Sequence, residues 1–339
     1  MIRVLVVDDS AVVRQVLTDG LASFSDIEVV GTAVDPYVAR DKIAQLKPDV
    51  LTLDIEMPRM DGLSFLSKLM KHYPLPVVVV SSLAPEHSEL ALRALSEGAI
   101  DVIAKPGSTY STPDFGRLAR AVRAAAASRP TRRQEQTEKP PAITQMKTTN
   151  TILAIGASTG GTTAIETVLR GIPANGPGTV IVQHMPEGFT RTFAERLNGV
   201  CQMQVSEARD NDIITPGVAL VAPGNQHMIV KRSGTCFMVE LKDGPLVYYQ
   251  RPAVELMFQS VARSAGRNAV GVILTGMGAD GSKGLLEMRN AGAYTIAQDE
   301  QSSVVFGMPK EAIKLGGATE VLPLGKIAGA VLNYIGKSS

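Results

Sequence analysis

Short apolar runs, mostly of β-branched residues, alternate with helical patterns along both halves of this chain. The clearest runs cover residues 4–7, 50–53, 77–80, 151–155 and 269–274. Between them, leucine, valine and alanine recur at the spacing of helices with one apolar face. Strands that are apolar throughout are buried on both faces of a sheet. The alternation therefore predicts an α/β fold with parallel sheets covered by helices.

One segment breaks the alternation. Residues 128–150, SRPTRRQEQTEKPPAITQMKTTN, contain only three apolar side chains. Such a segment cannot bury enough apolar surface to offset its conformational entropy. We therefore predict an interdomain linker at 128–150, between one domain at 1–127 and a second at 151–339.

Composition excludes several classes of protein. The 339 residues include 34 Lys+Arg and 33 Asp+Glu, a net charge of +1. Residues 1–127 carry 13 basic and 16 acidic residues, and residues 151–339 carry 16 and 15. Neither half has the basic excess of a nucleic-acid-binding protein, so no nucleic-acid partner is expected. The chain has two cysteines and no run of 18 apolar residues, so we expect a cytoplasmic protein without direct membrane insertion.

Chemically active side chains follow the predicted strands of the first half. Asp8 and Asp9 follow the first, Asp54 another, Ser81 the next, and Lys105 a later one. Functional groups of parallel sheets gather at these carboxyl ends. Clustered carboxylates suit Mg²⁺, which would neutralise charge on an incoming phosphoryl group.

This arrangement, with Asp54 followed by an M-P-x-x-D-G loop and Lys105 by a proline, resembles the receiver domains of two-component response regulators. The resemblance implies a flavodoxin-like fold with a parallel five-stranded sheet and phosphorylation of Asp54. It implies Ser81 and Lys105 as the groups that contact the phosphoryl group. The Mg²⁺ ligands that it implies are Asp8, Asp9, Asp54 and the backbone carbonyl of Glu56.

The second half opens with a strand, a glycine-rich turn and a helix. The turn contains Ser158 in the pattern G-x-S-x-G, which exposes a serine hydroxyl on a tight turn. The helix that follows would favour the negative charge of an oxyanion. A nucleotide-binding turn is the main alternative, but Ser158 stands where G-x-G-x-x-G requires its second glycine.

A histidine and an acid complete a candidate for nucleophilic catalysis. His184 ends the next predicted strand and is placed to act as a general base for Ser158. His227 is the competing base, but it begins a strand. Asp280 follows a strong apolar strand and would orient His184. Other acids are placed less suggestively: Asp210, Asp212 and Asp299.

Taken in order, the receiver pattern, GASTGG, QHMP and LTGMGADG resemble the chemotaxis protein-glutamate methylesterase family, whose members are also glutamine deamidases. The resemblance implies a serine hydrolase with Ser158, His184 and Asp280 as catalytic residues. It implies oxyanion or substrate contacts from Met277 and Thr159, and no cofactor in the catalytic domain. The implied partners are the cytoplasmic domains of chemoreceptors as substrate and the chemotaxis histidine kinase as phosphodonor.

Together these interpretations predict a receiver followed by a doubly wound, mainly parallel α/β methylesterase domain with a small hairpin insertion near residues 228–250. We hypothesise that the unphosphorylated receiver inhibits the second domain. The alternative is a response regulator whose output domain binds nucleic acid or a nucleotide.

Overall fold

The computed structural model describes most of the chain and divides it into two compact units, Met1–Glu135 and Gln136–Ser339. The predicted linker at 128–150 lies outside the described residues except for Ser128. Within the part of the chain that is described, no helix has the length and apolar character needed to cross a membrane. The described residues are 1–57, 61–81, 85–105, 115–128 and 151–337.

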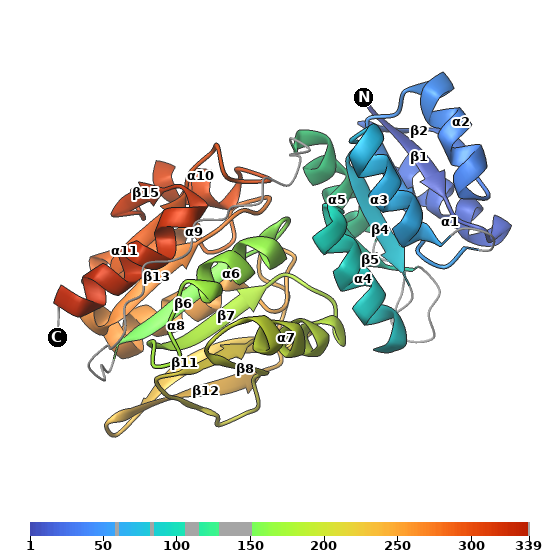
Figure 1. Cartoon of the computed structure of the whole chain (residues 1–339). Helices are drawn as coiled ribbons and strands as arrows, with labels where there is room; N and C mark the ends of the chain where they lie inside the picture. The colour runs from blue at the N-terminus through green and yellow to red at the C-terminus, as the bar shows by residue number, and fades with distance from the viewer. Residues whose placement is uncertain (58–60, 82–84, 106–114, 129–150, 338–339) are drawn as a thin grey trace. The chain divides into compact units, whose positions relative to one another are not determined.

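The first unit contains a five-stranded sheet in the order β2-β1-β3-β4-β5 (Figure 1). Every neighbouring pair is parallel, and this order is that of flavodoxin-like folds. The predicted parallel five-stranded sheet is confirmed. The strands are β1 (Ile2–Val7), β2 (Ile27–Ala33), β3 (Val50–Leu53), β4 (Val77–Ser81) and β5 (Asp101–Ala104).

Five helices accompany this sheet, and side-chain caps start three of them. Ser10 accepts from the amide of Val13, and Asp35 and Asp61 cap the second and third helices in the same way. These side-chain acceptors satisfy amides that a helix leaves unpaired in its first turn. The helices are α1 (Ala11–Ala22), α2 (Pro36–Leu46), α3 (Gly62–His72), α4 (Pro85–Glu97) and α5 (Phe115–Ala127).

The second unit is built on a seven-stranded sheet in the order β15-β14-β13-β6-β7-β10-β8. All of its pairings are parallel. The chain leaves β6 toward β7 on one side and returns to β13 on the other, so the strand order reverses at β6. Ligands of open α/β sheets bind at such a reversal, beyond the carboxyl ends of the strands. The strands are β6 (Ile152–Ala157), β7 (Gly178–Gln183), β8 (Gln204–Glu207), β10 (Val218–Val221), β13 (Ala269–Ile273), β14 (Tyr294–Gln298) and β15 (Glu320–Leu322).

A small antiparallel sheet is inserted into this unit. Strands β11 (His227–Ser233) and β12 (Cys236–Lys242) form a hairpin, which confirms the predicted insertion near residues 228–250. A third strand, β9 (Ile213–Ile214), pairs with β12. Helix α8 (Val254–Ala265) packs against β11.

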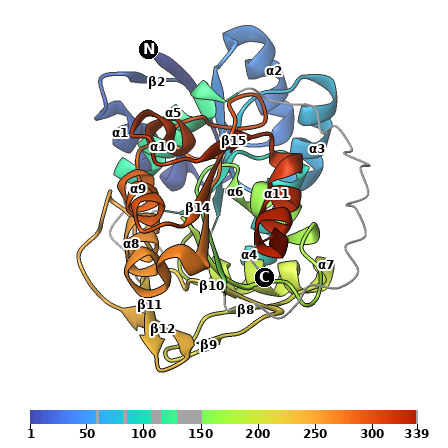
Figure 2. The same ribbon diagram turned by 90° about the vertical axis from the view of Figure 1, so that its left-hand side faces the viewer.

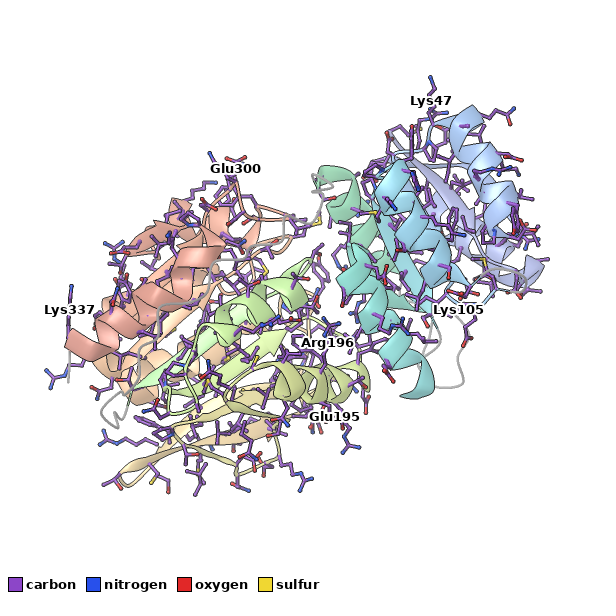
Figure 3. All side chains as sticks on the ribbon, viewed as in Figure 1. Lys47, Lys105, Glu195, Arg196, Glu300 and Lys337 are labelled. Carbon is purple, nitrogen blue, oxygen red and sulfur yellow. The ribbon has the colours of Figure 1, made fainter. Side chains whose placement is uncertain are left out.

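Helices lie on both faces of the seven-stranded sheet (Figure 2). On one face α11 packs against α6, and on the other α8 packs against α9. Charged side chains such as Lys47, Glu300 and Lys337 extend away from the ribbon (Figure 3). The helices of this unit are α6 (Gly161–Arg170), α7 (Phe189–Val200), α8 (Val254–Ala265), α9 (Ser282–Asn290), α10 (Met308–Lys314) and α11 (Leu324–Lys337), with a 3₁₀ turn at Gly266–Asn268.

Candidate functional sites in the two units

The turn that carries Ser158 is held from both sides. The Ser158 amide donates to Thr275 O at 3.0 Å. The Ser158 carbonyl accepts from Gly161 N at 2.7 Å and from Gln183 Nε2 at 2.9 Å. Gly160, with φ of 77°, adopts the left-handed conformation directly before α6, which glycine adopts without strain. These bonds fix the serine beside Thr275, which follows β13, and Gln183, the last residue of β7.

The segment after β13 runs directly against Ser158. A Cβ on Gly276 would lie 2.7 Å from Ser158 Cβ, so only glycine allows this approach. Met277 is the next residue, and its amide has no hydrogen-bond acceptor among the described residues. The hydroxyl of Thr275 donates to Thr159 O at 3.0 Å. Met277 and Thr159, the predicted oxyanion or substrate contacts, thus adjoin the serine along the backbone.

His184 follows β7, next to the end of β6. Its amide donates to Ala157 O at 3.2 Å, so His184 and Ser158 occupy equivalent positions beyond paired strands. The imidazole is buried, and its Nε2 lies 2.7 Å from Asp280 Oδ2. Its buried Nδ1 has no hydrogen-bond partner among the described residues. Within those residues the structure contains the His184–Asp280 hydrogen bond but none between Ser158 Oγ and His184.

Asp280 is buried and fixed by the first amides of α8. Val254 N donates to its Oδ2 and Glu255 N to its Oδ1, each at 2.8 Å. The unpaired amides and the dipole at a helix N-terminus stabilise a negative charge. As a carboxylate, Asp280 only accepts hydrogen bonds, so His184 Nε2 carries the proton and Nδ1 is left as an acceptor.

His227, the competing base, is engaged elsewhere. Ala253 N donates to its Nδ1 at 3.2 Å, and its Nε2 lies 3.0 Å from Pro245 O. The residue is 2% exposed, and with both ring nitrogens engaged it has none left for a substrate or nucleophile. Its contact with Ala253, directly before α8, makes it a support of the helix end that holds Asp280. Its position in the sequence does not reveal this role.

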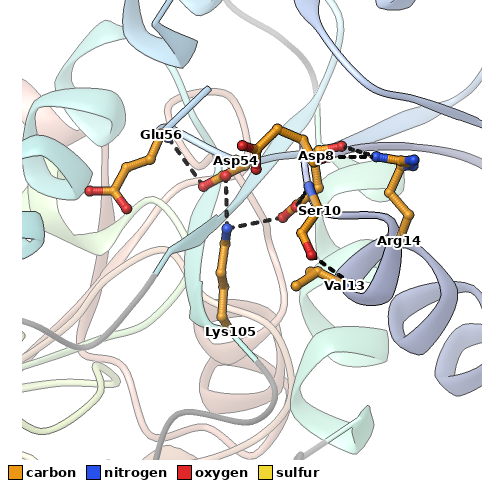
Figure 4. A network of polar contacts seen from close by, with 8 residues as sticks. Asp8, Ser10, Val13, Arg14, Asp54, Glu56 and Lys105 are labelled. Atoms are coloured by element: carbon orange, nitrogen blue, oxygen red, sulfur yellow. Dashed lines mark hydrogen bonds and ion pairs between the residues drawn. The ribbon is translucent and has the colours of Figure 1, made fainter. Parts of the chain in front are cut away.

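The acidic cluster of the first unit forms around Lys105 (Figure 4). Lys105 Nζ lies 2.7 Å from Asp54 Oδ2 and 3.1 Å from Asp8 Oδ2. Lys105 Nζ thus forms ion pairs with both buried carboxylates. Asp8, Asp9 and Asp54 each offer a carboxylate oxygen, and these oxygens lie within 4.8 Å of one another.

Burial dominates the electrostatics of this cluster. It raises the pKa of Asp54 to about 6, although the bond from Lys105 acts in the opposite direction. Burial lowers the pKa of Lys105, but the carboxylates of Asp54 and Asp8 more than offset this and raise it. A divalent cation would relieve the repulsion between the buried carboxylates, so the donor set fits Mg²⁺.

The remaining predicted residues lie around Asp54. Glu56 N donates to Asp54 Oδ1 at 3.2 Å, so the Glu56 backbone lies against the cluster. Ser81 is the last residue of β4, and its buried hydroxyl has no hydrogen-bond partner in the described ranges. Arg14 was not singled out from the sequence, yet it donates to the backbone carbonyls of Asp8 and Asp9 at 2.8 and 3.0 Å (Figure 4).

Comparisons with known proteins match each half of the chain to a protein family. The CheB methylesterase family matches residues 153–331, and the response regulator receiver domain family matches residues 4–111. A protein-glutamate methylesterase/protein-glutamine glutaminase of Syntrophus aciditrophicus is 56% identical over 98% of this chain and 99% of its own. The chain belongs to the CheB methylesterase family.

Other CheB methylesterases support the same conclusion. A protein-glutamate methylesterase/protein-glutamine glutaminase of Salmonella typhi is 52% identical over 98% of this chain and 97% of its own. The Thermotoga maritima CheB methylesterase catalytic domain, known from a crystal structure, shares 37% sequence identity with this chain, and the two structures superpose with a TM-score of 0.53. It covers 54% of this chain and 98% of that domain. The alternative of a nucleic-acid- or nucleotide-binding output domain has no support from these relatives.

Proposed function

We propose that this chain hydrolyses γ-methyl esters of glutamate side chains in chemoreceptors, with Ser158 as the nucleophile. The observation that carries the proposal is the buried His184–Asp280 pair, in which His184 Nε2 lies 2.7 Å from Asp280 Oδ2. His184 follows β7, and Ser158 follows β6, the strand with which β7 pairs. The relatives named protein-glutamate methylesterase/protein-glutamine glutaminase support this substrate. They also support hydrolysis of glutamine side-chain amides.

In the proposed mechanism His184 Nδ1 takes the proton of Ser158 Oγ. Nδ1 is assigned because Nε2 is engaged with Asp280, and it is the ring nitrogen without a partner. The alkoxide attacks the ester carbonyl, the C–O bond to the methoxy group breaks, and the proton on Nδ1 passes to the leaving oxygen, which departs as methanol. Water deprotonated by the same nitrogen then releases the glutamate carboxylate and restores Ser158.

The developing oxyanion requires donors beside Ser158. We assign the Met277 amide to this role, with Thr159 as a neighbouring contact, because the close approach of Gly276 brings this segment against Ser158. One such donor typically contributes about 10²–10³ in rate.

The direct test is release of methanol from receptor membranes carrying labelled methyl esters. We expect the full-length chain to release the label and to leave free carboxylates. Absence of release by folded, full-length protein, with or without a phosphodonor, would contradict the proposed function.

Replacement of Asp280 by asparagine is expected to lower kcat about 10³–10⁴-fold, because an amide does not hold His184 in the tautomer with a free Nδ1. Asp210→Asn is the matched control: Asp210 Oδ1 also accepts a hydrogen bond from a backbone amide, that of Leu241 at 2.9 Å, but within the described residues Asp210 forms no hydrogen bond with a histidine. Methanol release and thermal unfolding should be measured on both variants. Equal activity of Asp280→Asn and Asp210→Asn would contradict the role of Asp280.

We also propose that phosphorylation of Asp54 by the chemotaxis histidine kinase regulates the hydrolase. In this proposal Lys105 pairs with the phosphoryl oxygens, and Ser81 turns its buried hydroxyl toward them. We retain residues 1–127 as the receiver, 128–150 as the linker and 151–339 as the catalytic domain. The end of α5 at Ala127 and the start of β6 at Ile152 support these bounds. We infer cytoplasmic action, because the cytoplasmic domains of receptors carry the proposed substrate.

Mg²⁺ would be held by Asp8, Asp9, Asp54 and the Glu56 carbonyl, and when bound it supplies positive charge for phosphoryl transfer. We expect millimolar Mg²⁺ to raise the melting temperature of the receiver unit, because the ion binds only the folded cluster. Asp9→Asn should reduce this shift, whereas Asp41→Asn, at an exposed ion pair with Arg40, should retain it. An unchanged shift in Asp9→Asn would remove Asp9 from the ligand set.

A further inference from the structure

Two consecutive tyrosines form the tip of a tight turn in the catalytic unit. Val247 and Gln250 exchange backbone hydrogen bonds of 3.1 and 2.9 Å, which close a two-residue hairpin. Tyr248 and Tyr249 between them have φ angles of 50° and 62°. We call residues 247–250 the tyrosine turn.

This backbone is unfavourable for tyrosine. Turns with positive φ at both central residues are of the type I′ pattern and strongly prefer Asn-Gly or Gly-Gly, since side chains with a Cβ strain the left-handed conformation. Aromatic residues make up only 4% of the chain, and Tyr249 is 73% exposed. The ring of Tyr249 therefore does not serve the hydrophobic core. Strained backbone that the surroundings hold in place is concentrated at functional sites.

The surroundings do hold the tyrosine turn in place. Arg251 Nε and Nη2 donate to Asn225 Oδ1 at 3.1 and 2.6 Å, and Arg251 Nη1 donates to Gly244 O. On the other side His227 Nε2 bonds to Pro245 O. These contacts bracket the turn and fix the direction in which its tip projects.

The same residues connect the turn to the catalytic carboxylate. His227 Nδ1 accepts a hydrogen bond from the Ala253 amide. The amides of the next two residues, Val254 and Glu255, donate to Asp280. Burial raises the pKa of Tyr248, and the carboxylates of Glu255 and Asp280 raise it further. The Tyr248 phenol thus lies within the electrostatic reach of the acid that orients His184.

We propose that Tyr248 and Tyr249 bind the polypeptide that flanks the modified glutamate and so make the enzyme selective for protein esters. The proposal rests on the proposed function and extends it to a specificity-determining surface. Tyrosine suits such a surface because it offers apolar area and a hydroxyl while losing little conformational entropy on binding. Leu246, also exposed, adds apolar area beside the turn.

The test compares two substrates for the full-length enzyme: methylated receptor and a small capped glutamate γ-methyl ester. We expect Tyr249→Ala and Tyr248→Ala to lower the ratio of kcat/KM for receptor over kcat/KM for the small ester about tenfold, mainly through KM. Tyr37→Ala is the control, since Tyr37 is a half-exposed tyrosine of α2 in the other unit. An unchanged ratio, or equal losses on both substrates, would overturn the proposal.

A second variant separates binding from folding. Tyr248→Asn with Tyr249→Gly restores the preferred residues of a type I′ turn, so it should raise the melting temperature by roughly 2–4 °C. Its receptor-to-small-ester ratio should nevertheless fall as in the alanine variants. A stabilised protein with the wild-type ratio would overturn the proposal. If the wild-type enzyme hydrolysed neither substrate, the proposed function itself would fail.

Discussion

Ser158→Ala should lower ester hydrolysis at least about 10⁴-fold, because no other hydroxyl can replace the nucleophile that forms the acyl-enzyme. Binding should survive, since the turn is held by backbone bonds of Ser158 that alanine retains. We therefore expect KM to change little. The measurement is methanol release from methylated receptors, with thermal unfolding as the check on folding.

Thr167→Ala provides the matched control for the loss of a hydroxyl. Thr167 lies on α6, directly after the same turn, and its hydroxyl donates to Thr163 O at 2.9 Å within the helix. It should retain wild-type hydrolysis. Activity of Ser158→Ala within tenfold of the wild type would exclude Ser158 as the nucleophile.

Asp54→Asn should abolish stable phosphorylation of the receiver, because an amide has no anionic oxygen with which to form an acyl phosphate. We expect the neighbouring acids not to substitute, because Lys105 Nζ lies nearer to Asp54 Oδ2, at 2.7 Å, than to Asp8 Oδ2, at 3.1 Å. The measurement is incorporation of labelled phosphate from a small phosphodonor or from the chemotaxis histidine kinase.

The regulatory part of the proposal depends on the same variant. Asp19→Asn, at an exposed carboxylate that accepts from Gln15 at 2.8 Å, should incorporate phosphate and respond to the phosphodonor as the wild type does. Asp54→Asn should show no increase in methanol release when the phosphodonor is added. A full increase in that variant would show that activation does not pass through Asp54.

The central strands could be predicted from the sequence, whereas two of the edge strands, β2 and β8, could not. Strands β4 and β6 are buried throughout, so their residues are almost all apolar, with Ser81 at the end of β4 as the exception, and they stand out in the sequence. Strands β2 and β8 lie at sheet edges and mix buried with exposed positions. Their weaker patterns do not distinguish them from loops, because an edge strand buries less of its surface.

The candidate catalytic residues were visible in the sequence for a related reason. In a parallel sheet, a functional side chain directly follows an apolar strand, as Ser158 and His184 do. The supports of the site were not visible, because they come from unrelated segments. The backbone amides of Val254 and Glu255 bind Asp280 because α8 begins beside it. Backbone amides are present at every residue but proline, so the side chains at these positions do not indicate the contact.

The sequence by itself determined two α/β folds, the nature of the reactive groups, and the family to which they belong. Only the tertiary structure decided which nitrogen of His184 meets Asp280, a residue 96 positions away, and that both nitrogens of His227 are engaged elsewhere. It also decided that two tyrosines occupy a strained turn and that Tyr248 lies within the electrostatic reach of Asp280. The physical reason is that local pattern specifies strands and helices, whereas hydrogen-bond partners depend on which strand ends and helix ends the sheet order brings together.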